Sequence, residues 1–349
     1  MHDVLTKLLD QRSSIERETW RSFWDQLGDD GLDRAQAVAL LASLATRLPD
    51  HETLRNMVAS LDERRPDVTE RWPGSVNIVG TGGGPKTFNI STASAFVAAA
   101  MGVRVVKTGS RAYASSCGSI DLLERLGVGL TSSYQHTSDT LDRFGIAFAG
   151  PFVYPTALAQ LARTILPMSL RPFGRFLNAL GPFLAELPVT AQVTGVSGHA
   201  PLPELRRLAA AIGDRTIWLC TNDLGADELL GFADNVIYAN DGADELRLRP
   251  GRLTSGAGTL EDLRPVEEPG SVVEHFLAVV SGAANDVATQ TVCLNAAALA
   301  VASGHHDEWA SAITAADQAV RSGAARDLLE GMRSRRQRLV SLSGAVGHG

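Results

Sequence analysis

Residues 75–109 read SVNIVGTGGGPKTFNISTASAFVAAAMGVRVVKTG, and the order of patterns in this stretch decides the fold. Two short runs rich in β-branched residues, 75–80 and 103–109, each end in glycine, which is typical of buried strands. Between them, the small residues from Ser91 onwards predict a helix that a Ser/Thr cap opens. A strand, a helix and a second strand in this order favour a parallel sheet covered by helices.

The loop GTGGGPKT at 80–87 is similar to a nucleotide-binding P-loop but departs from it at one position. The pattern GxxxxGK[ST] needs a glycine where this chain has Pro85, whose nitrogen carries no hydrogen and whose ring fixes φ. The dinucleotide fingerprint GxGxxG fails at the same position. The sequence therefore contains neither nucleotide motif at this loop.

The same loop still predicts an anion site. It leads from a strand into a helix start, where free N–H groups and the positive end of the helix dipole converge. Its glycines allow the backbone to approach a ligand closely, and Asn89, Ser91 and Thr92 supply side-chain donors. The alternative is that Ser91 or Thr92 only caps the helix, which would leave the glycines unexplained.

A second strand end adds positive charge and hydroxyl groups. The segment KTGSR places Lys107 and Arg111 at the same carboxyl edge of the sheet, where open α/β folds bind ligands. Ser115, Ser116 and Ser119 precede the next predicted helix and form a second candidate phosphate contact.

Two adjacent carboxylates, Asp227 and Glu228, follow the predicted strand TIWLC at 216–220. Near a phosphate site such a pair is a candidate Mg²⁺ locus, because this cation is shared between carboxylates, water and substrate phosphates. The alternative is a helix start, which favours acidic residues for dipole reasons alone. A near-copy, NDGADEL, offers Asp244 and Glu245 as a second candidate pair.

The chain before this region is helical in pattern. In LDRAQAVALLASLATRLPD at 32–50 the apolar residues recur every three or four positions, and Asp33 is placed to cap the helix. No strand signal precedes residue 75, so we predict four or so helices there. The later segment 155–188 interrupts the strand–helix alternation with a second helical pattern punctuated by prolines.

The predicted fold is therefore α/β, with a small discontinuous all-α lobe beside a large α/β domain whose mainly parallel central sheet is flanked by helices. We assign 1–70 to the α lobe, joined by helices from 155–188. The large domain takes 71–154 and 189–340, and 341–349 form a flexible tail. A cleft between the two parts is the default ligand site.

Composition narrows the class of partner. The net charge of −7 argues against a nucleic-acid-binding surface. The three cysteines form no disulfide framework, no signal peptide pattern is present, and the apolar runs are too short to span a bilayer. We expect a cytoplasmic protein whose partner is a small molecule rather than a nucleic acid or a membrane.

In this order the motifs resemble those of the anthranilate phosphoribosyltransferase family. The family pattern runs GTGGD, TxNIST, KHGNR, SGSAD with LExLG, LGP, DGxDE and LLNAAA. The counterparts here are GTGGG, TFNISTASAFVAAA, KTGSR, CGSIDLLERLG, LNALGP, LGADE and CLNAAALAVASG. The resemblance implies a small α lobe on a large α/β domain, a homodimer formed through the α lobe, and phosphoribosyl pyrophosphate (PRPP) used with Mg²⁺.

Position by position, the resemblance also implies the residues that hold the donor. The PRPP contacts would be Gly80, Gly82, Gly83, Asn89, Ser91, Thr92, Lys107 and Ser119. The metal ligands would be Ser91, Asp227 and Glu228, because the helix and strand before this acidic pair fit the segment that leads into the family's DGxDE. Lys107 would act electrostatically, and no covalent nucleophile is implied.

The departures from the family pattern concern the acceptor side. An ungapped alignment puts Met168 where the family has a carboxylate-binding arginine, with Arg171 available only if the segment shifts. Arginine pairs bidentately with a carboxylate, so its loss weakens selection for an acidic acceptor. The candidate acceptor contacts, which include three replaced family residues of the KHGNR and HP motifs, are Thr108, Ser110, Tyr154, Met168 and Arg171.

We therefore predict PRPP-dependent transfer of a phosphoribosyl group to a small acceptor, with release of pyrophosphate. The expected acceptor is an aromatic amine or acid of specialised metabolism, or an amino-sugar-like amine or alcohol. The alternatives are a genuine anthranilate phosphoribosyltransferase of tryptophan biosynthesis, a nucleoside phosphorylase-like enzyme and a non-catalytic PRPP-binding protein. The sequence leaves Gly84, which stands where the family has aspartate, unexplained.

Overall fold

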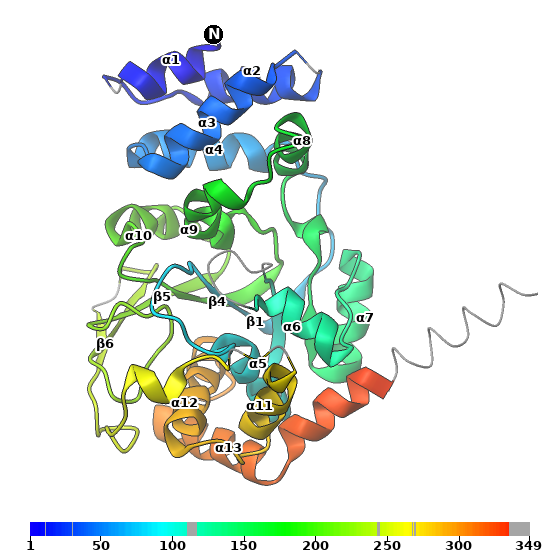
Figure 1. The fold of residues 1–349 in the computed structure, drawn as a ribbon, viewed down its shortest axis with the longest axis vertical. Helices are drawn as coiled ribbons and strands as arrows, with labels where there is room; N and C mark the ends of the chain where they lie inside the picture. The colour runs from blue at the N-terminus through cyan, green and yellow to red at the C-terminus, as the bar shows by residue number, and fades with distance from the viewer. Residues whose placement is uncertain are drawn as a thin grey trace, which may run out of the picture.

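The computed structural model describes residues 1–10, 12–29, 31–109, 117–242, 245–266, 268 and 270–334. Figure 1 shows helices at one end of the molecule and a sheet with its covering helices at the other. The named helices are α1 (Asp3–Asp10), α2 (Arg17–Gly28), α3 (Arg34–Thr46), α4 (His51–Asp62), α5 (Ile90–Ala100), α6 (Ser119–Leu126), α7 (Tyr134–Phe144), α8 (Thr156–Thr164), α9 (Gly174–Leu184), α10 (Leu202–Ala210), α11 (Ser271–Val280), α12 (Asp286–Ala302) and α13 (Trp309–Arg321). Short 3₁₀ helices are η1 (Pro151–Val153), η2 (Arg171–Phe173) and η3 (Leu260–Leu263).

Seven strands of the described residues form one sheet, in the order β3-β2-β1-β4-β5-β6-β7. The strands are β1 (Trp72–Gly80), β2 (Arg104–Lys107), β3 (Ile146–Phe148), β4 (Val189–Gly195), β5 (Thr216–Asn222), β6 (Asn235–Ala239) and β7 (Leu246–Leu248). All pairs from β3 to β5 are parallel, whereas β6 and β7 pair antiparallel with their neighbours. The predicted α/β class and mainly parallel sheet are confirmed.

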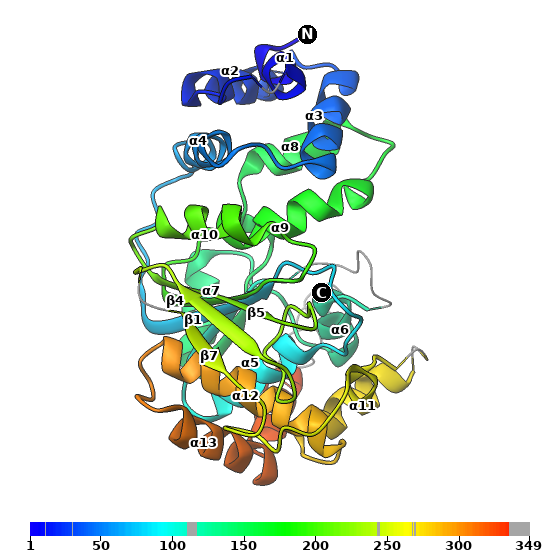
Figure 2. The ribbon, with the colours of Figure 1, turned by 90° about the vertical axis from the view of Figure 1, so that its left-hand side faces the viewer.

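Helices cover both faces of this sheet (Figure 2). On one face, α5 and α12 bury small side chains in a large apolar cluster that contains Val76 of β1 and Val193 of β4. On the other face, α9 and α10 pack in a second cluster that contains Ile217 of β5. Because both faces are covered, the ends of the strands are the part of the sheet left for a ligand.

The second cluster continues into the N-terminal helices, of which there are four before β1. It contains Trp20 and Phe23 of α2, Leu161 of α8 and Phe183 of α9. The helices at 3–62 and 156–184 therefore share buried apolar contacts. The domain boundaries remain predictions, and the predicted tail at 341–349 lies outside the described residues.

The start of α3 agrees with the sequence. The Asp33 side chain accepts a hydrogen bond of 2.8 Å from the Gln36 amide, which is the predicted N-cap. No helix in the described ranges is long and apolar enough to cross a bilayer.

The start of α5 differs from the prediction of a Ser/Thr cap. The helix begins at Ile90, and Asn89 occupies the N-cap position without a side-chain capping bond. The Asn89 side chain instead donates to the Cys117 carbonyl over 3.4 Å, which takes it away from the helix start. Ser91 and Thr92 lie inside the helix, so the alternative that one of them serves only as its cap is wrong.

Candidate active site

The loop at 80–87, which we call the glycine loop, follows β1 and meets the loop after β5 at the carboxyl edge of the sheet. The Gly82 amide donates a 2.7 Å hydrogen bond to the Asp227 carboxylate. Gly80 and Gly195 are paired at the ends of β1 and β4, and a Cβ atom at either would collide with Asp227. The loops can therefore approach this closely only because both strands end in glycine.

Ser197, just beyond β4, holds the glycine loop from its other side. Its hydroxyl donates to the Gly82 carbonyl over 2.7 Å, and its amide donates to the Thr81 hydroxyl over 3.0 Å. Both polar groups of the Gly82 residue are thus bound, the amide by Asp227 and the carbonyl by Ser197. Sequence reasoning missed Ser197, because a serine hydroxyl alone gives no signal for this contact with the distant Gly82.

Lys107, the last residue of β2, is buried and points into the same region. Its ammonium donates to the Ser91 hydroxyl and to the Ile78 carbonyl, each over 3.2 Å. Burial lowers the pKa of Lys107 to about 8, although the charges of Glu228 and Asp227 act in the opposite direction. An anion bound beside Lys107 would favour its charged form.

The acidic pair follows β5 in a segment that forms no helix, so the helix-start alternative for Asp227 and Glu228 is wrong. Burial raises the pKa of Asp227, and the Gly82 hydrogen bond opposes that effect. Burial, and then the charge of Asp227, raise the pKa of Glu228 well above its usual value. Two buried carboxyl groups with raised pKa values therefore lie together where the glycine loop ends.

The donor set of this pair fits Mg²⁺. One Glu228 oxygen accepts from the Thr87 hydroxyl over 3.4 Å, and the other is buried without a partner among the described residues. A buried carboxylate oxygen without a partner is costly, and a hard cation would satisfy it. No three side chains of His, Cys, Asp or Glu gather in the described ranges, so remaining ligands would come from hydroxyl groups, water or substrate.

The second candidate acidic pair lies elsewhere. Glu245 pairs with Arg247 beside β7, and Asp244 lies outside the described residues. Among the described residues, Asp227 and Glu228 are the candidate carboxylates in contact with the glycine loop.

The other predicted donor contacts surround the start of α5 and the end of β2. Gly82 and Gly83 have φ values of 61° and 80°, which favour glycine. Thr92 is fully buried, and its hydroxyl has no partner in the described part of the chain. Ser119 begins α6, and its hydroxyl packs so closely on Gly109 that a Cβ atom at Gly109 would collide with it. Ser110, Arg111, Ser115 and Ser116 fall outside the described residues.

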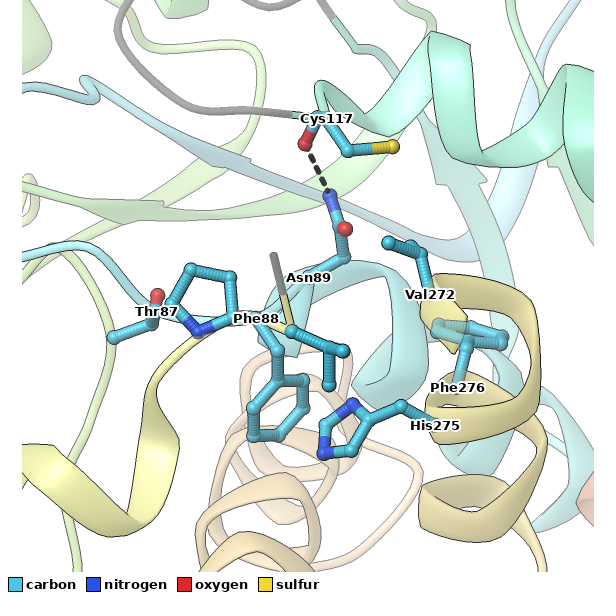
Figure 3. Close-up of a pocket in the computed structure, with 9 residues that line it drawn as sticks. Thr87, Phe88, Asn89, Cys117, Val272, His275 and Phe276 are labelled. Atoms are coloured by element: carbon cyan, nitrogen blue, oxygen red, sulfur yellow. Dashed lines mark hydrogen bonds between the residues drawn. The ribbon is translucent and has the colours of Figure 1, made fainter. Parts of the chain in front are cut away.

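A small pocket, which Phe88 and Asn89 help to line, lies next to this site. Figure 3 shows the Asn89 amide turned toward Cys117, with the His275 ring beside Phe88. The two rings meet edge to face with centroids 5.2 Å apart. The pocket volume of about 20 Å³ is enough for a water molecule and too small for a substrate.

The predicted acceptor residues occupy two places. Thr108 is buried directly after Lys107. Burial raises the pKa of Tyr154, and the interaction of its hydroxyl with the Thr108 side chain opposes that effect. Met168 packs against the second apolar cluster, and Arg171 begins η2. The helix that follows, α9, brings the Asn178 side chain to the glycine loop, 3.4 Å from a Cβ built on Gly82, a contact that sequence reasoning missed.

The structure gives a physical reason for Gly84. A Cβ atom at this position would lie 2.8 Å from the Gly225 carbonyl oxygen. Real Cβ contacts are longer than this, so any side chain at position 84 would push the glycine loop away from the segment that carries Asp227.

Comparisons with known proteins show which family the chain is similar to. Residues 73–326 match the model of the glycosyl transferase family, a/b domain. The chain is 33% identical to the anthranilate phosphoribosyltransferase of Methylorubrum extorquens over 95% of each chain. It is also 33% identical to that of Cenarchaeum symbiosum, covering 87% of this chain and 88% of the relative.

Solved structures show the same fold. Anthranilate phosphoribosyltransferase from Thermus thermophilus superimposes with a TM-score of 0.78 at 27% identity, covering 96% of this chain and 99% of that chain. The Saccharomyces cerevisiae protein in complex with PRPP and Mg has a TM-score of 0.72 at 20% identity, with 92% of each chain covered. From the family match and these relatives, the chain belongs to the anthranilate phosphoribosyltransferase family of pentosyltransferases.

Proposed function

We propose that the protein transfers a 5-phosphoribosyl group from PRPP to a small-molecule acceptor and releases pyrophosphate. The observation that carries this proposal is the meeting of three groups at one sheet edge: the glycine loop, the buried Lys107 and the Asp227–Glu228 pair. Backbone amides and an ammonium suit phosphates, and two carboxylates suit the cation that accompanies them. The yeast relative was solved with PRPP and Mg, which supports the same assignment.

The chemistry requires no covalent bond to the protein. The acceptor forms a bond to C1 of the ribose while the bond from C1 to the pyrophosphate oxygen breaks. The leaving oxygen keeps the electron pair, and the acceptor gives up a proton. Lys107 and the loop amides would stabilise the negative charge on pyrophosphate, which makes positioning and charge stabilisation the main catalytic effects.

The donor contacts that we propose are those implied by the sequence: Gly80, Gly82, Gly83, Asn89, Ser91, Thr92, Lys107 and Ser119. Ser91, Asp227 and Glu228 would hold Mg²⁺. When bound, this cation supplies positive charge that stabilises the leaving pyrophosphate. Asp227 is already oriented by the Gly82 amide, and Glu228 by the Thr87 hydroxyl.

For the acceptor we propose a small aromatic amine or acid other than plain anthranilate, or an amino-sugar-like amine. Support comes from Met168, which an ungapped alignment puts where the family has a carboxylate-binding arginine, and from Tyr154 beside Thr108. Anthranilate itself is the second candidate, because the relatives that match along nearly the whole chain carry that name.

The first experiment tests phosphoribosyl transfer. Purified protein is incubated with PRPP, Mg²⁺ and a panel of acceptors, and pyrophosphate is measured. We expect release that depends on the acceptor and is lost in Glu228→Gln. Release from nucleosides plus phosphate, without PRPP, would instead identify a phosphorylase. Absence of both PRPP binding and acceptor-dependent release would refute the proposed function.

The second experiment separates the acceptors. Anthranilate is titrated against the wild-type protein and against Arg171→Ala, with Arg175→Ala as a control on the adjacent helix. We expect weak anthranilate binding that neither variant changes. Tight binding that Arg171→Ala alone abolishes would mean that Arg171 serves the carboxylate and that anthranilate is the acceptor.

The predicted domains, oligomeric state and location of the protein are also proposals. We propose an α lobe of residues 1–70 joined by 155–188, a large domain from the rest of the chain to 340, and a homodimer that forms through the α lobe. We also propose a cytoplasmic location.

A further inference from the structure

A cavity of about 420 Å³ lies between α2, the end of α4, the start of α7 and the start of α8, and it shares only Tyr154 with the candidate acceptor contacts. We call it the lateral cavity. Figure 1 shows α8 above α7 to the right of centre, with α2 and α4 near the top of the molecule. Its volume falls within the range of small-molecule sites. Met168 and Arg171, the acceptor candidates on the chain between α8 and α9, do not line it.

Two arginines and three carboxylates line the lateral cavity, which leaves an excess of one negative charge. Arg64 pairs with Asp25 at 2.6 Å, and Arg65 pairs with Asp62 at 3.0 Å and with Glu186 at 3.4 Å. Asp29, at the end of α2, also lines the cavity. Its carboxylate has no charged partner in the ranges that the structure describes. The cavity is therefore complementary to a ligand with one positive charge.

The walls of the lateral cavity are aromatic. Trp24, Tyr134, Phe152 and Tyr154 all line it. Tyr134 and Phe152 meet edge to face, with centroids 5.0 Å apart. Trp24 is buried, with its ring nitrogen donating to Ser60 and its ring stacked on Trp20, so Tyr134, Phe152 and Tyr154 are the more accessible aromatic side chains of the lining. Aromatic faces of this kind bind flat rings and attract cations.

The Gln160 side chain adds a neutral polar group to the lining. The Gln160 side chain of α8 faces α2, with its nitrogen 3.9 Å from a Cβ built on Gly28. Its amide has no hydrogen-bond partner among the described residues and is free to bind an N–H or hydroxyl group of a ligand.

We propose that the lateral cavity binds a small aromatic amine, with its ring among the aromatic side chains and its ammonium at Asp29. The site is separate from the proposed phosphoribosyl transfer. It adjoins the acceptor side through Tyr154, whose ring lines the cavity while its hydroxyl lies beside Thr108.

The test uses tryptamine as the probe, the full-length protein without PRPP, and calorimetric titration. Indole-3-acetate has the same ring and the opposite charge, so it serves as the ligand control. We expect tryptamine to bind once per chain and indole-3-acetate not to bind. Asp29→Asn should weaken tryptamine binding by roughly tenfold, because it removes the only unpaired charge of the lining.

Asp67→Asn is the matched control, since Asp67 is an exposed carboxylate close to the cavity that does not line it. This variant should bind tryptamine as the wild type does. Unchanged melting temperatures would show that both variants are folded. The proposal is overturned if tryptamine does not saturate the wild type, if Asp29→Asn binds as the wild type does, if Asp67→Asn weakens binding equally, or if indole-3-acetate binds as tightly.

Discussion

Lys107 is placed so that its charge depends on pH in the neutral range. Burial lowers its pKa to about 8, whereas an ordinary lysine keeps its proton to above pH 10. As pH rises through 8, the free protein loses the ammonium that we propose for pyrophosphate. We predict that kcat/KM for PRPP falls with a midpoint near pH 8, because this ratio reports groups of the free enzyme.

The variant Lys107→Arg isolates this effect, since a guanidinium stays protonated across the whole range. Its activity will be lower because Arg is larger than the space around Lys107. The informative quantity is the shape of the profile between pH 6 and 10. A falling limb near pH 8 that persists in Lys107→Arg would assign the limb to another group and contradict the prediction.

Ser197 is a positioning residue for the proposed metal and donor site. Its hydroxyl binds the carbonyl of Gly82, whose amide in turn orients Asp227. We predict that Ser197→Ala lowers the free energy of unfolding by about 1 kcal/mol, the usual effect of losing one hydrogen bond. The affinity for PRPP with Mg²⁺, measured by calorimetry, should fall by more than this loss of stability explains.

Ser281→Ala provides the comparison, because Ser281 also donates a 2.7 Å hydrogen bond to a backbone carbonyl but lies at the end of α11. It should cost similar stability and leave PRPP affinity unchanged. Equal PRPP affinities in the two variants would show that Ser197 has only a structural role.

At the scale of single residues, the sequence predicted those that follow a motif and missed those that depend on folding. Asp227 could be found because it is an acidic residue at the end of a strand. Ser197, Thr87 and Asn178 could not be selected, because each reaches the site through a contact with a residue that is distant in the sequence. Hydroxyl and amide side chains are common, and only the three-dimensional arrangement distinguishes these three.

Among the elements, the glycine loop and the Gly225–Glu228 segment fit one another closely at Gly84. We predict that Gly84→Ala lowers the free energy of unfolding by about 1–3 kcal/mol, as overpacking does, because the new Cβ would meet the Gly225 carbonyl. Gly213→Ala is the matched control, since a Cβ atom there meets nothing within 4 Å. Denaturant unfolding measures both, and equal stability of the two variants would contradict the prediction.

The elements themselves were predictable to different degrees. Buried strands such as β1 and β4 can be recognised in the sequence as runs of β-branched residues that end in glycine. β7 has three residues, which is too few for a recognisable period. The start of α5 was predicted wrongly, because the Asn89 side chain bonds to Cys117 in a different segment rather than to its own helix.

At the scale of the whole molecule, the two helical segments are joined by an apolar cluster that also reaches the sheet. Leu205 of α10 and Ile217 of β5 belong to the same cluster as Trp20 of α2. The sequence analysis predicted that the two helical segments join, but helical periodicity did not predict that their shared core reaches the sheet, because periodicity describes one helix at a time. The packing of the N-terminal helices is thus coupled to the sheet whose strand ends form the candidate site.

The helical segments also carry exposed apolar side chains, which bears on the proposed homodimer. Of five large apolar residues exposed in the described ranges, Met1, Leu9 and Leu166 lie in or beside these helices. An interface through these helices would remove such side chains from water, which is favourable. We predict a particle of two chains by light scattering, and Leu9→Lys should reduce it to one chain because an interface would bury the new charge without a partner. Leu246→Lys on β7 is the control and should leave the mass unchanged. An interface through the α lobe would be refuted if the wild-type protein is a single chain. It would also be refuted if the dimer persists in Leu9→Lys but is lost in Leu246→Lys.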